Sequence, residues 1–127
     1  MGDFVHLHTH SNYSLLDGLS SIEDLVASAK RLNFKALALT DHGTCGGLWP
    51  FQEHCQKEGI KPILGSEMYI TEDRKSRDKN GARSYHLVLT AKNEQGYRNL
   101  IKLNSLAYIE GFYYKPRIDM ELLSQYS

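Results

Sequence analysis

Three histidines occupy alternate positions near the start of the chain, at His6, His8 and His10, with apolar Val5 and Leu7 beside the first two. Because the side chains of an extended strand point alternately to its two faces, we expect the three imidazoles to share one face. Neutral imidazole is a common ligand of Zn, Mn and Fe. The spacing therefore predicts a metal site on a strand over about 4–11, with solvated surface histidines or an expression tag as the alternatives.

Carboxylate and imidazole side chains recur further along the chain. Asp17 follows the histidine segment in a loop, and a short buried strand is expected to end with Asp41 and His42. A later strand contains Glu67 among apolar residues, where an unpaired carboxylate is costly. Glu67 therefore calls for a cation, and a metal ion is the obvious candidate.

The elements expected to position these residues alternate along the chain. In order they are helix 21–32, strand 35–43, helix 48–58, strand 60–70, strand 84–91, helix 94–108 and a short amphipathic helix at the end. This alternation favours an α/β fold of predominantly parallel strands with flanking helices. The segment 71–84 carries mixed charges without apolar periodicity, which predicts an exposed, mobile loop, with contact to nucleic acid as the alternative.

In α/β folds the reactive residues gather at the carboxyl ends of the strands. Five residues fit that rule and are expected to converge on one rim: His8, His10, Asp17, His42 and Glu67. Nitrogen and carboxylate ligands without cysteine favour Zn, Mn or Fe and hydrolytic chemistry. Five ligands exceed what one tetrahedral ion needs, so we expect two or three ions, a kind of cluster that clamps phosphate esters and activates a water.

Composition excludes some classes of function. The 15 Lys and Arg residues balance the 15 Asp and Glu residues, which argues against tight binding of a phosphate backbone by this chain alone. No apolar run approaches the roughly 20 residues of a membrane span and no signal peptide opens the chain, so we expect a cytoplasmic protein without membrane contact. Cys45 and Cys55 are expected to be free thiols, with Cys45 as an alternative ligand beside His42.

Four short motifs resemble, in order and spacing, those of the PHP (polymerase and histidinol phosphatase) family. They are His8-Thr9-His10-Ser11, Thr40-Asp41-His42-Gly43, Gly65-Ser66-Glu67 and Tyr85-His86-Leu87. Further stretches, at 13–18, 59–63, 89–93 and 110–119, resemble one branch of the family, the amino-terminal domains of bacterial replicative DNA polymerase III α subunits. The resemblance covers essentially the whole chain.

The resemblance implies a distorted (β/α)7 barrel with a trinuclear site of Zn or Mn, with Fe as a further option, on its carboxyl-end rim. The ligands that it implies are His8, His10, Asp17, His42, Glu67 and His86. His86 depends on the resemblance, because the start of a strand is not where the rim rule places a ligand. It also implies that Asp41 orients an imidazole, and that Asp17, Asp41 and Glu67 are the catalytic carboxylates. His6 remains an open alternative ligand.

The function implied is a metal-dependent phosphoesterase module that removes nucleotides from DNA 3′ ends. Its partners would be the remainder of the domain and polymerase chain, DNA, and other replicase subunits. One alternative is a metal-stabilised scaffold that supports the polymerase or docks a proofreading subunit. Another is a phosphomonoesterase similar to histidinol phosphatase, against which the stretch 112–119 argues.

The sequence departs from the family pattern in one respect. The family completes its site with a later acidic or cysteine ligand and a final Asp-x-His, whereas no histidine follows His86. Residues 1–127 are therefore expected to form the first part of a PHP domain, with an open sheet edge that needs covering. Alone, this part is expected to show weak hydrolysis or none.

Overall fold

The computed structural model describes residues 4–78 and 83–126. The helices are α1 (Ile22–Arg31), α2 (Leu48–Glu58), α3 (Glu94–Ile109) and α4 (Met120–Gln125). The strands are β1 (Ala36–Leu39), β2 (Lys61–Ile70), β3 (Tyr85–Thr90) and β4 (Arg117–Ile118). Among these helices, none has the length and apolar character needed to cross a membrane.

The strands form one mixed sheet with β2 at its centre. β2 pairs in parallel with β1 and with β4, and antiparallel with β3. The α/β class is confirmed, but the expectation of predominantly parallel strands is wrong for β3. A parallel return after β2 would need a crossover that packs back on the sheet, and residues 71–78 and 83–84, the described part of the connection to β3, contain no helix. No barrel closure is seen within the described residues.

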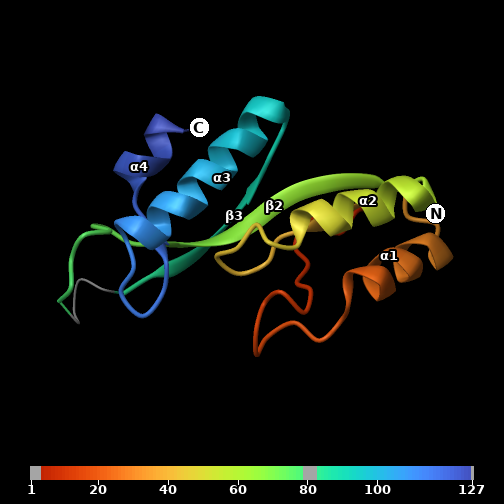
Figure 1. The fold of residues 1–127 in the computed structure, drawn as a ribbon, viewed down its shortest axis with the longest axis horizontal. Coiled ribbons are helices and arrows are strands. Elements are labelled where there is room, and N and C mark those ends of the chain that lie inside the picture. The colour runs from red at the N-terminus through yellow and green to blue at the C-terminus, as the bar shows by residue number, and fades with distance from the viewer. Residues whose placement is uncertain (1–3, 79–82, 127) are drawn as a thin grey trace.

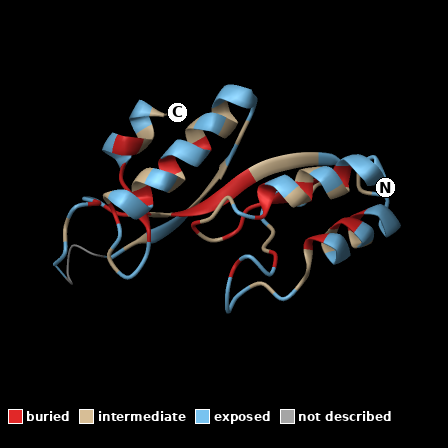
Figure 2. Cartoon of the chain, in the orientation of Figure 1, coloured by how far each residue is buried: buried red, intermediate tan, exposed pale blue. Residues whose placement is uncertain are grey.

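Strand β2 runs through both halves of the molecule (Figure 1). At one end it carries β1, α1 and α2, and at the other end β4, α3 and α4 lie against it. Two clusters of buried apolar side chains result, and the buried stretch of β2 lies between them (Figure 2). The first core includes Val26, Leu39 and Phe51, and the second includes Met68 and Ile118.

Three of the described helices, α1, α3 and α4, begin where a polar side chain accepts a hydrogen bond from one of their first amide groups. The Ser21 hydroxyl accepts a hydrogen bond from the Asp24 amide at 3.1 Å, and α1 then buries Ile22, Val26 and Ala29 at helical spacing. Asn93 caps α3 in the same way, through the Gly96 amide at 2.9 Å. These caps fix the residues at which α1 and α3 begin.

The histidine segment is not the regular strand that its alternation predicts. The Ala38 amide donates to the His6 carbonyl at 2.9 Å, and the Thr40 amide donates to the Thr9 carbonyl at 2.8 Å. The histidine segment advances three residues, from His6 to Thr9, while the facing chain advances two, from Ala38 to Thr40. A regular ladder of hydrogen bonds therefore cannot continue. The Thr9 amide instead donates to the Thr40 side-chain oxygen at 3.0 Å. The segment lies beside β1, but it is held in part by a side chain.

The charged segment after β2 is docked on the second half rather than exposed throughout. Arg74 is buried, and its Nη1 donates to both carboxylate oxygens of Asp119, at 2.8 and 2.9 Å. Its Nε donates to Glu110 at 3.0 Å. The buried Arg117 donates from Nη2 to the carbonyls of Arg74 and Ser76. The prediction of an exposed loop is therefore wrong at Arg74, and residues 79–82 lie outside the described residues.

Replacing Asp119 with asparagine is expected to flatten the acid side of the stability profile. Burial alone would raise the pKa of Asp119, but hydrogen bonds from Leu122 and Arg74 lower it below its ordinary value. A carboxyl with a depressed native pKa contributes stability that is present above its unfolded-state pKa and is lost as the pH falls through the native pKa. Urea unfolding between about pH 5 and pH 2 should show a weaker pH dependence for Asp119→Asn.

The matched control for that experiment is Asp24→Asn, a change at an exposed carboxylate of α1. The free energy of unfolding should fall less steeply with decreasing pH in Asp119→Asn than in Asp24→Asn. Equal slopes for Asp24→Asn and Asp119→Asn would contradict the assignment of this acid sensitivity to Asp119.

Candidate metal centre

The carboxylate of Glu67 is the point on which the imidazoles converge. Its Oε2 lies 2.5 Å from Nε2 of His8 and 2.6 Å from Nε2 of His10. Its other oxygen, Oε1, lies 2.8 Å from Nδ1 of His86. Glu67 is only 3% exposed although it is a carboxylate within a strand. Three imidazoles therefore contact Glu67, and the expected metal ion at this carboxylate stays a prediction.

The sheet register explains how side chains from three strands reach the same place. His42 lies three residues after β1 and forms an isolated parallel bridge with Glu67 of β2. On the other side of β2, His86 pairs with Tyr69, two residues after Glu67 and on the same face. Because β3 is antiparallel to β2, its first residues lie beside the carboxyl end of β2. This places His86 on the rim even though it begins a strand.

The loop after the histidine segment returns Asp17 to the same cluster. Its Oδ2 lies 2.7 Å from Nδ1 of His10 and 3.3 Å from Nε2 of His42. The loop is tightly wound, because the Ser14 carbonyl accepts hydrogen bonds from the amides of Asp17 and Gly18. Asp17 is 55% exposed, whereas His10 and His42 are largely covered. Asp17 therefore forms the solvent side of the cluster.

The described residues contain three groups whose ligand atoms lie within 4.8 Å of one another. The groups are His8 with His10 and Glu67, His10 with Asp17 and His42, and His42 with Glu67 and His86. Each group shares a member with another, so the three form one continuous cluster. The structure thus brings together all six residues that were expected to be metal ligands.

The protonation states around Glu67 suit a metal ion. Burial lowers the pKa of His42 and outweighs the opposing effect of the Glu67 carboxylate, so His42 is neutral at pH 7. Burial alone would raise the pKa of Glu67, but hydrogen bonds from His8 and His10 lower it below its ordinary value. Nδ1 of His42 is buried and has no hydrogen-bond partner among the described residues. The other nitrogen, Nε2, lies 3.3 Å from Asp17 and 3.8 Å from Glu67, and a neutral imidazole beside an ionised carboxylate fits a divalent cation.

Comparison with known protein families gives a match to the PHP domain over residues 6–127. The chain belongs to the PHP domain family. It is 59% identical over 127 residues to the DNA polymerase III subunit alpha of Treponema pallidum, a match that covers 98% of this chain and 11% of that protein. The corresponding protein of Borreliella burgdorferi is 52% identical, with the same coverage. The chain thus spans about a tenth of the length of these relatives.

A solved structure supports the fold of this PHP chain. An amidohydrolase from Chromobacterium violaceum superposes with a TM-score of 0.57 and 24% sequence identity, covering 80% of this chain and 34% of that one. The similarity concerns the fold alone. It agrees with the α/β class of this chain.

Asp41 has a different place in the PHP chain from the one expected. Its carboxylate does not contact an imidazole; it accepts hydrogen bonds from the Ser11 amide at 2.6 Å and from the hydroxyls of Ser11 and Ser14, both at 2.8 Å. The Ser14 oxygen in turn accepts a hydrogen bond from the His42 amide at 3.0 Å. Asp41 therefore fixes the loop that carries Asp17 and acts on His42 only through the backbone. Only their place in the motifs marked the two serines before the structure was known.

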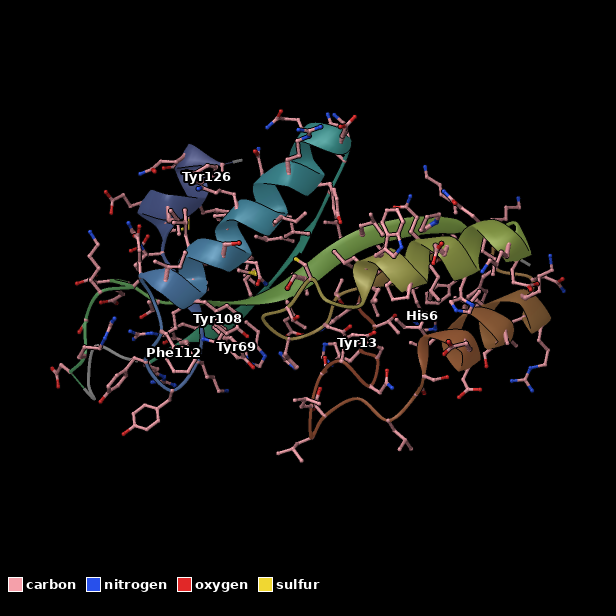
Figure 3. The ribbon with its side chains drawn as sticks, in the orientation of Figure 1. His6, Tyr13, Tyr69, Tyr108, Phe112 and Tyr126 are labelled. Carbon is pink, nitrogen blue, oxygen red and sulfur yellow. The ribbon has the colours of Figure 1, made fainter. Side chains whose placement is uncertain are left out.

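His6 lies apart from the metal-ligand groups. Its ring contacts Phe4 and Phe34, with centroids 4.7 and 5.5 Å away, and it lines a pocket of about 380 Å³ next to α1. Figure 3 shows it near α1, well away from Tyr69. Cys45 also lies outside the groups, and burial raises the pKa of its thiol to about 11, so it stays protonated at neutral pH.

The variant His6→Ala is accordingly expected to keep the metal content of the parent chain, because its ring packs on phenylalanines. His10→Ala removes a member of two ligand groups and should lower the content. Elemental mass spectrometry on both variants, purified without chelator or affinity tag, measures the difference. Equal losses in the two variants would show that His6 is a ligand after all.

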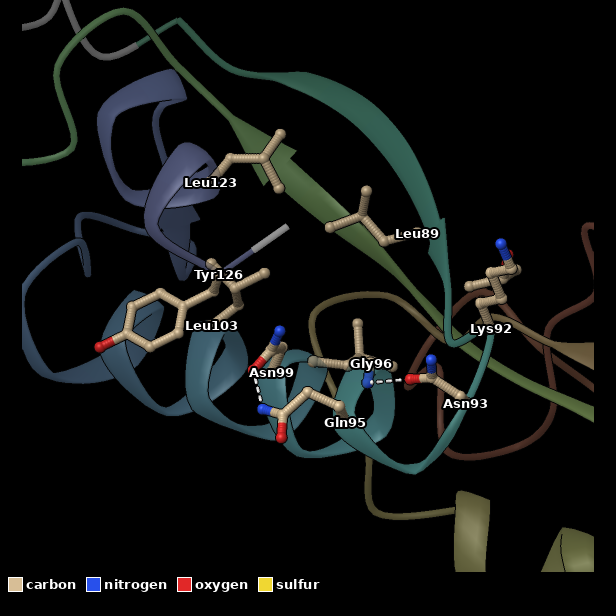
Figure 4. A pocket seen from close by; sticks show the side chains of 11 residues that line it. Leu89, Lys92, Asn93, Gln95, Gly96, Asn99, Leu103, Leu123 and Tyr126 are labelled. Carbon is tan, nitrogen blue, oxygen red and sulfur yellow. Dashed lines mark hydrogen bonds between the residues drawn. The ribbon is translucent and has the colours of Figure 1, made fainter.

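Another pocket, of about 420 Å³, lies between the end of β3, the start of α3 and α4 (Figure 4). Leu89, Leu103 and Leu123 form its apolar part. Two polar side chains of its lining, Gln95 and Asn99, form a hydrogen bond with each other. Its lining includes no imidazole or carboxylate, so the chemistry of the described residues lies at the Glu67 cluster.

Proposed function

We propose that this chain is the amino-terminal portion of the PHP domain of a bacterial replicative DNA polymerase, and that it contributes to metal-dependent hydrolysis of phosphodiester bonds at DNA 3′ ends. The observation that carries the proposal is the convergence of four imidazoles and the Asp17 carboxylate on the cluster around Glu67. The high identity to DNA polymerase III alpha subunits supports the replicative assignment. The activity of the whole protein is part of the proposal, because the chain spans a tenth of those relatives.

Divalent ions, Zn or Mn with Fe as a further option, would be held by the three overlapping ligand groups. When bound, such ions supply Lewis-acid stabilisation of phosphoryl oxygens and lower the pKa of a bound water. Glu67 keeps its negative charge because its imidazole neighbours lower its pKa, and so balances the charge of the ions. Its buried position excludes water from the inner side of the site.

Asp17 is the carboxylate that can exchange protons with the reaction. Its Oδ2 is on the solvent side of the cluster, within reach of His10 and His42, so it can accept a proton from an attacking water and release it to solvent. Asp41 is a positioning residue, because its carboxylate holds the serines of the Asp17 loop. The proposed partners are the remainder of the PHP domain and polymerase chain, DNA and other replicase subunits, in the cytoplasm.

A 3′-labelled single-stranded oligonucleotide tests the proposal. Release of the terminal nucleotide should require Mn²⁺ or Zn²⁺ and should fall at least tenfold in Asp17→Asn, since general acid–base groups contribute about 10²–10⁴-fold. The matched control is His54→Gln, a change at a surface histidine of α2 that pairs with Glu23. The chain should be assayed alone and within a polymerase chain that contains it, because we expect the part alone to be weak.

Two other results would select an alternative. A scaffold is favoured by one feature, namely that Glu67 ties together segments from both cores. Retained metal with no hydrolysis in the longer chain, together with loss of thermal stability on chelation, would support the scaffold. Hydrolysis of histidinol phosphate but not of the oligonucleotide would instead support the phosphomonoesterase.

A further inference from the structure

Lys115 lies next to the metal centre although it is distant from it in sequence. Its Nζ is 4.5 Å from the centroid of the Tyr69 ring. That ring stacks on His42, with centroids 5.7 Å apart and planes inclined by 14°, and contacts His86 edge-on with centroids 5.2 Å apart. One aromatic ring therefore joins the Lys115 ammonium to two of the expected metal ligands. Figure 3 shows Tyr69 beside Tyr108 and Phe112, at the turn that leads to Lys115.

The backbone around Lys115 is held in an uncommon conformation. Tyr114 has a φ of 59°, in the left-handed region that costs a residue with a side chain about 1–2 kcal/mol. The Tyr113 amide closes the turn by donating to the Lys115 carbonyl at 3.1 Å. Next to it, Arg117 is buried and pairs with Tyr69 in the sheet. Such strain persists where the surrounding structure enforces it, as it often does at binding sites.

Pro116 anchors the same turn to the metal-binding strand end. A β-carbon on Gly43 would lie 2.9 Å from Pro116 Cγ and 3.3 Å from the Tyr69 ring, so the backbone after His42 and the Lys115 turn are in close contact. Gly43 itself has a φ of 57°. The packing fixes Lys115 relative to His42 through rigid groups rather than through a flexible surface loop.

Within the described residues no carboxylate forms an ion pair with the Lys115 ammonium. That ammonium lies over the Tyr69 ring. An aromatic face attracts a cation without cancelling its charge, so the ammonium keeps its hydrogen-bond donors available. A phosphate ester at the metal centre would bring anionic oxygens to this side. Ammonium groups bind phosphate as point charges, without the fixed geometry that arginine imposes.

We propose that Lys115, held on the Tyr69 ring, binds a phosphate oxygen of the substrate beside the metal centre. The ligand class is a nucleotide phosphate, either the scissile group or its neighbour in the strand. This inference rests on the proposed function, since it assigns Lys115 to the same substrate. It adds a substrate-binding residue that comes from the turn before β4 and that is not a metal ligand.

The test is calorimetric titration of thymidine 5′-monophosphate into the Mn²⁺-loaded chain at fixed salt concentration. Lys115→Gln should weaken binding about tenfold, because a hydrogen bond to a charged group is worth about that factor. Lys115→Arg keeps the cation and should stay within about threefold of the parent chain. Lys57→Gln, at an exposed lysine of α2, makes the same change of charge away from the site and should leave affinity unchanged.

Unchanged affinity in Lys115→Gln would overturn the inference, as would an equal loss in Lys57→Gln or failure of the parent chain to bind the nucleotide. Metal content is measured on every variant and should be the same. That measurement and the oligonucleotide assay separate the two proposals. Loss of metal in the parent chain, or of hydrolysis in a polymerase chain that contains it, contradicts the proposed function. Nucleotide binding that does not depend on Lys115 contradicts only the role of this lysine.

Discussion

Glu67→Gln is expected to lower metal affinity by about a hundredfold or more. Removing a residue that merely orients a ligand typically costs 10–100-fold, and Glu67 is a member of two of the three ligand groups. Glutamine has nearly the same size and can still hydrogen-bond, so the sheet should be retained while the negative charge is lost. Titration of Zn²⁺ or Mn²⁺ against a competing chelator measures the change.

The control for this experiment is Glu72→Gln, at an exposed carboxylate just after β2. It removes the same charge only five positions along the chain, so it corrects for the general electrostatic effect. Similar affinities of Glu67→Gln and the parent chain would contradict the assignment of Glu67 as a ligand. Circular dichroism of both variants shows whether the fold is kept.

Arg74→Met is expected to destabilise the chain by about 3–5 kcal/mol, because removing one partner of a buried ion pair leaves the other charge uncompensated. Arg74 and Asp119 have side chains that are each 6% exposed, and Arg74 also contacts Glu110 and Glu121. Methionine keeps much of the volume and removes the charge. The free energy of unfolding from urea titration at pH 7 gives the cost.

An exposed ion pair between an arginine and a glutamate on α3 supplies the comparison. Arg98 contacts Glu94 one helical turn away, with both side chains at least 70% exposed. Such a pair contributes about 0.3–0.5 kcal/mol, so Arg98→Met should have a small effect. If Arg98→Met and Arg74→Met lower the free energy of unfolding equally, burial of the Arg74 charge does not determine the stability of the half that contains α3 and α4.

The rim residues of the candidate site follow directly from the sequence. Alternating histidines, a buried strand ending in His42 and an acidic residue inside an apolar strand are all local patterns. The rule that reactive residues gather at strand ends then brings His8, His42 and Glu67 together without further information. The meeting of His42 and Glu67 depends on parallel pairing of β1 and β2, which a helix between two strands predicts well. His8 reaches them because the histidine segment lies beside β1.

His86 could not be placed by that rule, because its position depends on the direction of β3. The sequence does contain the necessary signal, since no helical pattern separates the two strands and a direct return must be antiparallel. Applied consistently, that argument places the start of β3 beside the end of β2. Tyr69 follows for the same reason, as it lies two residues after Glu67 on the same face.

Other features depend on contacts between distant residues and leave no local pattern. Burial of Arg74 requires Asp119, which is 45 positions away in the chain. The irregular histidine segment arises because the Thr40 hydroxyl takes the place of a backbone acceptor for Thr9. In the first case the Asp119 carboxylate, rather than solvent, contacts the Arg74 charge. In the second case the Thr40 hydroxyl, rather than a backbone carbonyl, accepts the hydrogen bond from Thr9.

The central place of β2 has a consequence for how the chain unfolds. Leu64 packs against the first core and Met68 lies in the second, so neither half can open fully without disturbing the same strand. We therefore expect the amide protons in the middle of β2 to exchange with solvent through global unfolding, with the slowest rates in the chain. A ligand bound at Glu67, between these two residues, should slow amide exchange in both halves together.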